Sequence, residues 1–332
     1  MDEKIFTIIT TVYNKAKYLE KWAKSLANQT YLDKTNILII EDCSTDDSLR
    51  LLIELVEKYE LPAKIICNEK NMGLLYSIRK AYREIQSPDI RTKYFSVLDA
   101  DDYYLSARKI EKAVKFLEQH EDYSAYASNY ILKYRSGVEQ KAISDNVRDK
   151  TFFNMKDTPF FQTSAITFRN FFTPELLDRI DYFTEEKNFE ICEGDAFRNG
   201  IAFGFGKLFF ENSADAVWLC DIGDWGTLSS LEQDFCNMVG HWELFEFYRT
   251  QFKTHILTDL NTNYIFTLMI NFYQKSVLDF ANLMQNLDFF KFQCQPYFLK
   301  NFKKYGNNDA ERIVNALLYH GEILSDFGVV IK

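Results

Sequence analysis

The stretch Tyr94-Phe-Ser-Val-Leu-Asp-Ala-Asp-Asp102 joins a short apolar run directly to three carboxylates. An apolar run of this length is typical of a strand that is buried on both faces of a sheet. Carboxylates packed this closely repel one another, and a divalent cation such as Mg²⁺ or Mn²⁺ removes that repulsion. The stretch therefore predicts a cation site at the end of a buried strand. A helix cap is the alternative, with Asp101 or Asp102 preceding a helix near Ser106, because Asp is a favoured N-cap residue.

The chain before this stretch alternates strand and helix patterns. Apolar, β-branched runs predict strands, and apolar residues at three- and four-residue spacing predict a helix after each of them. The predicted strands are 5–11, 37–40, 63–67 and 94–98, and the predicted helices centre on 19–26, 49–56, 75–85 and 110–117. This alternation predicts an α/β fold class, in which a mostly parallel central sheet is covered by helices on both faces.

Polar segments follow all four predicted strands. They are Thr11-Val-Tyr-Asn14, Glu41-Asp-Cys-Ser-Thr-Asp46, Asn68-Glu-Lys-Asn-Met-Gly73 and Asp99-Ala-Asp-Asp102. Parallel strands bring such ends to one edge of the sheet, which is where α/β sheets bind ligands. One polar loop is ordinary turn chemistry, whereas four along one edge predict a binding site.

The pattern becomes irregular after about residue 122. We expect strands at 123–132 and 165–168 and a polar loop over 144–158, and from Gly240 onward apolar residues recur at helical spacing. The sequence therefore predicts a first domain over 1–238 and a C-terminal α-helical subdomain over 239–332.

The composition narrows the class of protein. The formal net charge of −9 disfavours a nucleic acid as partner. None of the six cysteines lies in a C-x-x-C pair, which favours free thiols in a reducing compartment. The first residues lack the pattern of a signal peptide, and no apolar run is long enough to cross a bilayer, so we expect a cytoplasmic protein.

One C-terminal segment, residues 289–305, mixes aromatic residues with four lysines. It is interpreted either as a peripheral membrane contact at the inner face of the plasma membrane or as helices packed on the first domain with solvated lysines. A contact between copies in a homo-oligomer is a third interpretation, and the sequence leaves all three open.

In order and spacing, the polar loops resemble those of family-two glycosyltransferases with the A-type (GT-A) fold. Segments 11–14, 41–46, 71–73 and 99–102 match, and Glu193-Gly-Asp195 with Arg198 matches less well. The resemblance covers about residues 4–225. It implies a Rossmann-like nucleotide-sugar-binding domain and an inverting transfer of sugar from a UDP-sugar to a hydroxyl of a glycan or lipid-linked acceptor. It further implies Mn²⁺ or Mg²⁺ as cofactor, and a setting in bacterial surface polysaccharide synthesis.

The resemblance also implies how the four loops hold the donor. The nucleoside lies along Thr11, Val12 and Tyr13, and the Asp42 carboxylate accepts a hydrogen bond from the uracil imide N–H. The metal ligands are Asp101 and Asp99, and Asp102 either supports these ligands or caps the following helix. The remaining predicted nucleotide-sugar residues are Asn14, Asn71, Gly73, Arg79 and Ala100. A plain turn over 11–14 with Asn14 as helix cap, and a solvated Arg79, are the alternatives.

An inverting transfer needs a carboxylate base to take the proton of the acceptor hydroxyl. The resemblance assigns this role to Asp195 or Glu193, and the glycine between them leaves the register open. Gln162 is predicted either to bind acceptor hydroxyls or to satisfy a buried strand edge. Trp225, in the predicted loop Trp218–Ser230, is predicted either to close over the donor as a lid or to lie in the core.

Two other classes of protein stay open on the sequence alone. A nucleotidyltransferase also places a metal-binding Asp pair on an α/β sheet, but it usually has a glycine-rich phosphate loop, and residues 11–17 contain no glycine. A non-catalytic nucleotide-binding or scaffold protein of the same fold is the other class, because Glu193-Gly-Asp195 departs from the family pattern.

Overall fold

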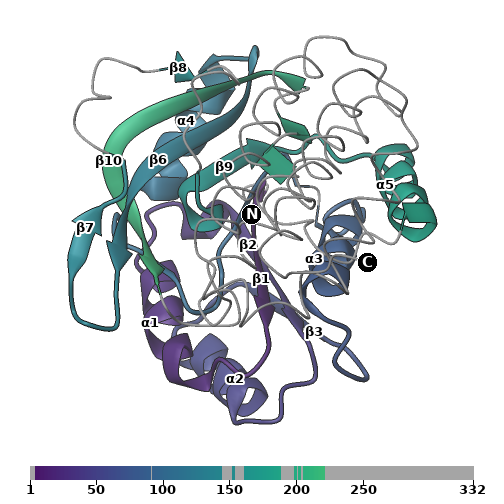
Figure 1. The fold of residues 1–332 in the computed structure, drawn as a ribbon, viewed down its shortest axis with the longest axis vertical. Coiled ribbons are helices and arrows are strands. Elements are labelled where there is room, and N and C mark those ends of the chain that lie inside the picture. The colour runs from purple at the N-terminus through teal and green to yellow at the C-terminus, as the bar shows by residue number, and fades with distance from the viewer. Residues whose placement is uncertain are drawn as a thin grey trace, which may run out of the picture. The chain divides into compact units, whose positions relative to one another are not determined.

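A computed structural model of the chain describes residues 4–90, 92–143, 152–153, 161–187, 198–199, 201–202 and 205–220 (Figure 1). These residues belong to the first of two compact units into which the chain divides. The predicted boundary after residue 238 and the predicted subdomain over 239–332 lie outside the described residues.

Four parallel strands form the first half of the sheet. They are β1 (Phe6–Val12), β2 (Thr35–Glu41), β3 (Ala63–Cys67) and β4 (Tyr94–Val97). Their order is β3-β2-β1-β4, and every pair is parallel. The predicted strands and their parallel direction are confirmed, and so are the loops that follow them at one edge.

Four helices connect and follow these strands, close to where the apolar spacing predicts them. They are α1 (Ala16–Ala27), α2 (Ser48–Lys58), α3 (Leu74–Glu84) and α4 (Lys109–Gln119). Residues of α1, α2 and α4 share a buried cluster with Phe6, Ile8 and Val12 of β1. Ile9 points to the opposite face and is also fully buried, and α3 contacts β1 and β2. Both faces of the sheet are therefore covered. None of the helices described here is long and apolar enough to span a membrane.

The second half of the sheet is mixed in direction. From β4 the order continues through β9 (Ile166–Arg169), β6 (Tyr123–Lys133), β10 (Lys207–Leu219) and β5 (Tyr103–Tyr104). Strand β9 runs antiparallel to both β4 and β6, whereas β10 runs parallel to β6, beside which it lies in Figure 1. Two short strands pair at the side, β7 (Glu139–Lys141) with β6 and β8 (Phe152–Phe153) with β10.

Several elements differ from the expectation. Strand β10 is not predicted, because its register against β6 shifts between Glu211 and Ala216 and interrupts the alternation of apolar and polar residues. The predicted loop over 144–158 contains β8, and the predicted loop over 218–230 begins inside β10. Trp218, the first residue of that range, lies in β10, and its ring centroid is 6.5 Å from that of Tyr130.

Helix α5 (Pro174–Lys187) is also not predicted. It is joined to α3 by ion pairs: Arg83 contacts Asp178 at 2.8 Å and also Asp181. These pairs connect positions about a hundred residues apart, so they cannot be predicted from a local pattern such as the three- and four-residue spacing of ion pairs within a helix.

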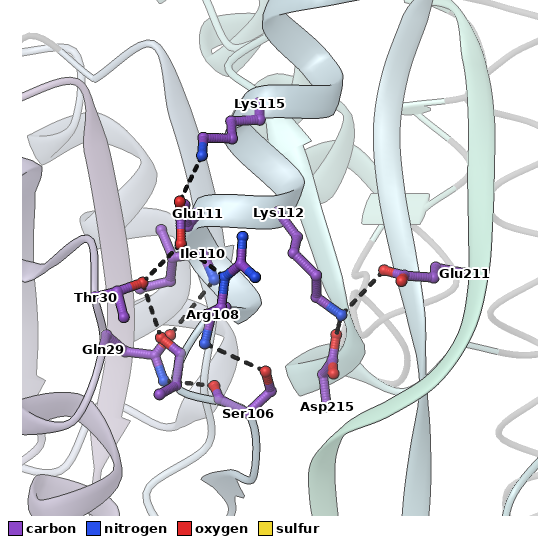
Figure 2. Close-up of polar contacts among 11 residues, drawn as sticks. Gln29, Thr30, Ser106, Arg108, Ile110, Glu111, Lys112, Lys115, Glu211 and Asp215 are labelled. Carbon is purple, nitrogen blue, oxygen red and sulfur yellow. Dashed lines mark hydrogen bonds and ion pairs between the residues drawn. The ribbon is translucent and has the colours of Figure 1, made fainter.

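The beginning of α4 is held by side chains of other elements (Figure 2). Gln29 donates to the Ser106 carbonyl at 2.9 Å and accepts from the Ile110 amide at 3.4 Å. On the other side of the helix, the Lys112 ammonium lies 2.5 Å from Asp215 and 3.0 Å from Glu211 of β10. The helix has no side-chain cap of its own, and Gln29 takes over that role from outside.

The first residue of α4, Lys109, is fully buried. Its ammonium has no hydrogen-bond partner within the part of the chain that the structure describes, and it lies 4.9 Å from the Tyr104 ring centroid. Burial lowers the pKa of Lys109 from 10.5 to about 8, although Asp215 partly opposes the shift. The buried ammonium is therefore a local cost to the fold.

We expect Lys109→Met to stabilise the protein at pH 7. Below pH 8 both the folded and the unfolded chain carry the proton, so folding bears the full cost of about 3 kcal/mol that follows from the lowered pKa. Between pH 8 and 10.5 the unfolded chain binds more of that proton than the folded chain, so this part of the stability returns as the pH rises.

Thermal unfolding at pH 7 and pH 10 checks this expectation. The melting temperature of Lys109→Met should exceed that of the wild type at pH 7, and the difference should shrink at pH 10. Lys115→Met, on the same helix with a side chain 62% exposed, is the matched control and should show no such difference. A variant that melts below the wild type at pH 7 would mean that the contacts of the Lys109 ammonium outweigh its burial cost.

Candidate functional site

The loop after β1 is tied to the loop after β2 by Asn14. Its Oδ1 accepts hydrogen bonds from the backbone amides of Thr45 at 2.8 Å and Asp46 at 3.2 Å. The backbone amide of Asn14 donates to Ser44 Oγ at 3.1 Å. Asn14 has a φ of 54°, a left-handed conformation that asparagine tolerates better than most residues. Helix α1 has Lys15 as N-cap residue and no side-chain cap, so the alternative in which Asn14 caps it is wrong.

Asp46 and Ser48, which follow β2, accept hydrogen bonds from backbone amides at the start of α1 and so connect the same two loops. Asp46 accepts from the Ala16 amide at 3.2 Å and from the Ser48 amide at 2.9 Å, and Ser48 Oγ accepts from the Lys15 amide at 2.8 Å. Burial alone would raise the pKa of Asp46, but the hydrogen bonds from Ser48 and Ala16 outweigh it and hold that pKa below its usual value. The first two loops of the edge thus form one braced unit.

Asp42, the predicted uracil contact, organises the third loop. It is buried, and its Oδ1 accepts from Asn68 Nδ2 at 2.7 Å and the Met72 amide at 2.9 Å, while Oδ2 accepts from the Gly73 amide at 2.8 Å. A carboxylate offers about four acceptor positions, so one stays available on Oδ2 after these bonds. Its contact with a base stays a prediction.

Asn68 connects Asp42 to α3 and was not singled out from the sequence. Its Nδ2 also donates to Ser77 Oγ at 2.9 Å, and its Oδ1 accepts from Lys80 Nζ at 2.8 Å. The only signal in the sequence is its position directly after β3, which many turn residues share.

Gly73 shows why the third loop needs a glycine. Its φ of 86° lies where other residues are strained, although a side chain there would meet nothing within 4 Å. Its amide is shared between Asp42 and Asn71 Oδ1, the latter at 2.9 Å. Arg79, six residues further along in α3, lies 3.8 Å from Asp181 of α5, and its predicted contact with the donor stays a prediction.

We expect Asp42→Asn to destabilise this loop. Turned one way, the NH₂ of the asparagine faces the Asn68 and Met72 donors; turned the other way, it faces the Gly73 amide, which then keeps only Asn71. Either orientation loses hydrogen bonds to a charged group, each of which contributes about 1.5–3 kcal/mol. Thermal unfolding should give a lower melting temperature, and the Met72 and Gly73 amides should exchange faster with deuterium. The exposed carboxylate of Asp47 offers the control Asp47→Asn, for which neither change is expected. Unaltered exchange in Asp42→Asn would show that the loop holds itself without the carboxylate.

The acidic stretch after β4 forms a tight turn, closed by a hydrogen bond from the Asp102 amide to the Asp99 carbonyl at 2.9 Å. Ala100 is buried, whereas Asp99 and Asp101 are partly exposed at the edge. Lys15 Nζ lies 2.5 Å from Asp101 Oδ2, a contact between the first and the fourth loop that the sequence did not indicate. All four predicted loops are therefore adjacent along one edge.

Asp102 is buried and binds the second half of the sheet. Its Oδ2 accepts from Gln162 Nε2 at 2.6 Å and Ser164 Oγ at 2.7 Å, and its Oδ1 accepts from the Leu219 amide at 3.0 Å. Burial, followed by the nearby Asp99 and Asp101, raises the pKa of Asp102 well above its usual value. Since α4 has no side-chain cap, the prediction that Asp101 or Asp102 caps it is wrong.

Gln162 holds Asp102 rather than standing free at the edge. It is buried, and its Oε1 accepts from the Ser164 amide at 2.8 Å at the start of a short 3₁₀ helix, Thr163–Ala165. This matches the strand-edge alternative for Gln162, and its contact with an acceptor stays a prediction.

The predicted base residues Asp195 and Glu193 lie outside the described residues, as does Trp225. Arg198, which follows them, is described and buried. Its guanidinium donates to Tyr82 Oη at 2.9 Å and to Thr163 Oγ1 at 3.1 Å. Through Thr163, this part of the chain is anchored beside the residues that hold Asp102.

The donor chemistry of the acidic turn fits a hard divalent cation. Asp99 and Asp101 offer carboxylate oxygens, and the Lys15 ammonium already places a positive charge against Asp101. Across the described ranges, no group of three or more His, Cys, Asp or Glu side chains could hold a metal alone. Such a cation would take its remaining ligands from water and from the phosphates of a bound nucleotide, as Mg²⁺ commonly does.

The parallel half of the sheet carries four interlocked polar loops at its carboxyl edge, the fourth of which is the acidic turn, and this arrangement is typical of a ligand-binding α/β domain. Residues 7–190 match the model of the family described as Glycosyl transferase family 2, a match over more than half of the chain. The chain belongs to this family, and the resemblance read from the polar loops is confirmed.

Curated relatives match part of the chain. An uncharacterized glycosyltransferase of Haemophilus influenzae is 34% identical over 124 residues, 37% of this chain and 36% of the relative. The poly(ribitol-phosphate) beta-N-acetylglucosaminyltransferase TarS of Staphylococcus aureus is 25% identical over 52% of this chain and 30% of its own. The putative glycosyltransferase EpsE of Bacillus subtilis is 27% identical over 46% and 52%. The chain thus spans about a third to a half of these relatives' lengths.

Two solved structures share the fold. The mannosyltransferase PcManGT of Pyrobaculum calidifontis, in complex with GDP-Man and Mn²⁺, aligns with a TM-score of 0.53 at 14% identity, over 95% of this chain and 86% of that one. TarS 1-349 of S. aureus, in complex with UDP-GlcNAc, aligns with a TM-score of 0.50 at 15% identity, over 81% of each chain. These likenesses confirm the predicted A-type fold class.

Proposed function

We propose that the protein is an inverting glycosyltransferase that moves a sugar from a UDP-sugar to a hydroxyl of a glycan or lipid-linked acceptor in bacterial surface polysaccharide synthesis. The observation that carries the proposal is the edge itself, where the first four loops are hydrogen-bonded or ion-paired to one another around an acidic turn. Family membership favours a sugar transferase over a nucleotidyltransferase, and a relative such as TarS, solved with UDP-GlcNAc, supports a UDP-sugar as donor.

The base and ribose of the donor would lie along the first three loops. Thr11, Val12 and Tyr13 would line the nucleoside, and the remaining acceptor position of Asp42 would take the uracil N3–H. Cytosine presents an unprotonated N3 at the same place, which a carboxylate repels, so the site would select uracil. Asn14 and Asn71 would act indirectly, because both hold loop backbones in place.

The diphosphate would lie over the acidic turn, where Asp99 and Asp101 would hold Mn²⁺ or Mg²⁺. The bound cation would take up the negative charge that develops on the departing UDP. Asp102 would keep the turn in position through its bonds to Gln162, Ser164 and the Leu219 amide. A mannosyltransferase of the same fold, solved with Mn²⁺, supports the choice of cation.

The acceptor hydroxyl would lose its proton to Asp195, or to Glu193 if the register differs, as its oxygen attacks the anomeric carbon. Arg198 would hold the start of the following segment through Tyr82 and Thr163. Trp225 would shield the donor from water.

Calorimetry followed by a turnover assay tests the proposal. UDP should bind in the presence of Mn²⁺ while CDP binds much more weakly, and one member of a UDP-sugar panel should release UDP slowly in the absence of acceptor. Absence of UDP binding with either cation would contradict the proposed donor. Tight UDP binding without turnover of any UDP-sugar would support the non-catalytic nucleotide-binding protein instead, which the Glu193-Gly-Asp195 segment leaves room for.

A further inference from the structure

The ion pair between Lys15 and Asp101 joins the first loop to the acidic turn. The two side chains are 25% and 13% exposed, and their charged atoms are 2.5 Å apart. The backbone of Lys15 is fixed independently, because its amide donates to Ser48 Oγ. The contact with Asp101 is made by the side chain, while this hydrogen bond holds the backbone of the loop.

The Lys15 ammonium is positioned as a monovalent stand-in for a divalent cation. It contacts a carboxylate oxygen that is also a proposed metal ligand, and the acidic turn carries three carboxylates within four residues. A positive charge at this position relieves their mutual repulsion, in the same way as a metal ion would. A metal ion that approaches Asp101 in the absence of a nucleotide must displace the ammonium or share the carboxylate, and its negative charge, with it.

A bound nucleoside diphosphate changes that balance. Its two phosphates bring negative charge to the same edge. This charge balances the positive charges of both the ammonium and a divalent cation, so that the two can be held together. Lysine binds phosphate as a compact point charge, and its long side chain gives the ammonium a choice of partners.

We propose that Lys15 occupies the cation position at Asp101 in the nucleotide-free protein and moves to the diphosphate when the donor and the metal ion bind together. The inference rests on the proposed donor and cation. Lys15 makes metal binding depend on the nucleotide: the metal ion binds weakly alone and tightly with UDP. Because such coupling is reciprocal, UDP gains the same factor from the metal ion.

Titration of Mn²⁺, followed by the electron paramagnetic resonance signal of the free ion, tests this inference without any turnover. Without UDP, Lys15→Met should bind Mn²⁺ about 10-fold to 100-fold more tightly than the wild type, the usual range of such coupling. With UDP the two proteins should differ less, so that UDP raises the Mn²⁺ affinity by a smaller factor in the variant. Lys15→Arg, which keeps a cation on a long side chain, should stay close to the wild type.

The sign of the change separates this role from a structural one. If Lys15 only braced the acidic turn, its loss would misplace Asp101, and Mn²⁺ affinity without UDP would fall or stay the same; that result would overturn the inference. Lys17→Met is the matched control. Lys17 is exposed, lies two residues further along, and has its ammonium 4.7 Å from the centroid of the Tyr18 ring. The substitution removes the same charge and leaves the contact at Asp101 in place. An equal gain in Lys17→Met would reduce the effect to general electrostatics. Failure of the wild type to bind Mn²⁺ even with UDP would instead contradict the proposed function, and the inference with it.

Discussion

Asp195→Asn is expected to lower the rate of sugar transfer by a factor of about 10²–10⁴, the contribution typical of a positioned general base. Asparagine keeps the shape of the side chain but cannot take the proton of the acceptor hydroxyl. Binding of UDP in the presence of Mn²⁺ should change little, since the proposed donor contacts come from the first four loops. Steady-state transfer with a UDP-sugar and calorimetry with UDP measure the two quantities separately.

Glu193→Gln is the matched control for this substitution. It makes the same chemical change two residues away, on the other side of Gly194. The expected result is a small loss of transfer, and a large loss in Glu193→Gln with near-normal turnover in Asp195→Asn would move the base to Glu193. Near-normal turnover in both variants would remove the 193–195 segment from the reaction.

Asp101→Asn is expected to weaken Mn²⁺-dependent UDP binding by about 100-fold or more, beyond the 10- to 100-fold loss that follows removal of an outer partner of a metal ligand. The amide loses the negative charge that attracts the cation. The same substitution releases Lys15 from its ion pair. In EDTA the variant should therefore bind UDP at least as well as the wild type, because the ammonium is free to move to the diphosphate.

Calorimetry with UDP, in Mn²⁺ and in EDTA, checks both halves of this expectation. Asp89→Asn, at an exposed aspartate in the connection between α3 and β4, removes the same charge and should behave as the wild type. Equal UDP affinity of Asp101→Asn and wild type in Mn²⁺ would show that the cation, if it binds, is held elsewhere.

The parallel half of the fold can be predicted well, because each strand and each helix there shows a pattern within its own short stretch of sequence. Each strand from β1 to β4 is rich in apolar or β-branched residues, and each helix carries its apolar residues on one face. The loops at the carboxyl edge follow from the strand ends alone. The mixed half is less predictable: the register shifts of β10 against β6 depend on the partner strand and leave no regular period in the chain.

The candidate site divides in the same way. The residue types and their positions along the edge could be predicted, but their partners could not. Asn14 and Asp42 both prove to hold other loops in place, and the roles of Lys15 and Asn68 depend on side chains that lie far away in the sequence. Long-range hydrogen bonds of this kind have no signature in a single chain, because the same residues serve as ordinary turn formers elsewhere.

The bonds of Asp102 have a consequence for how the protein is made. Its carboxylate takes hydrogen bonds from residues 60, 62 and 117 positions further along the chain. A nascent chain that has left the ribosome only as far as β6 holds all four parallel strands, yet the acidic turn still lacks the three donors that fix it. The hydrogen bonds that hold the acidic turn are therefore completed late in synthesis, only after β10 has emerged and joined the sheet.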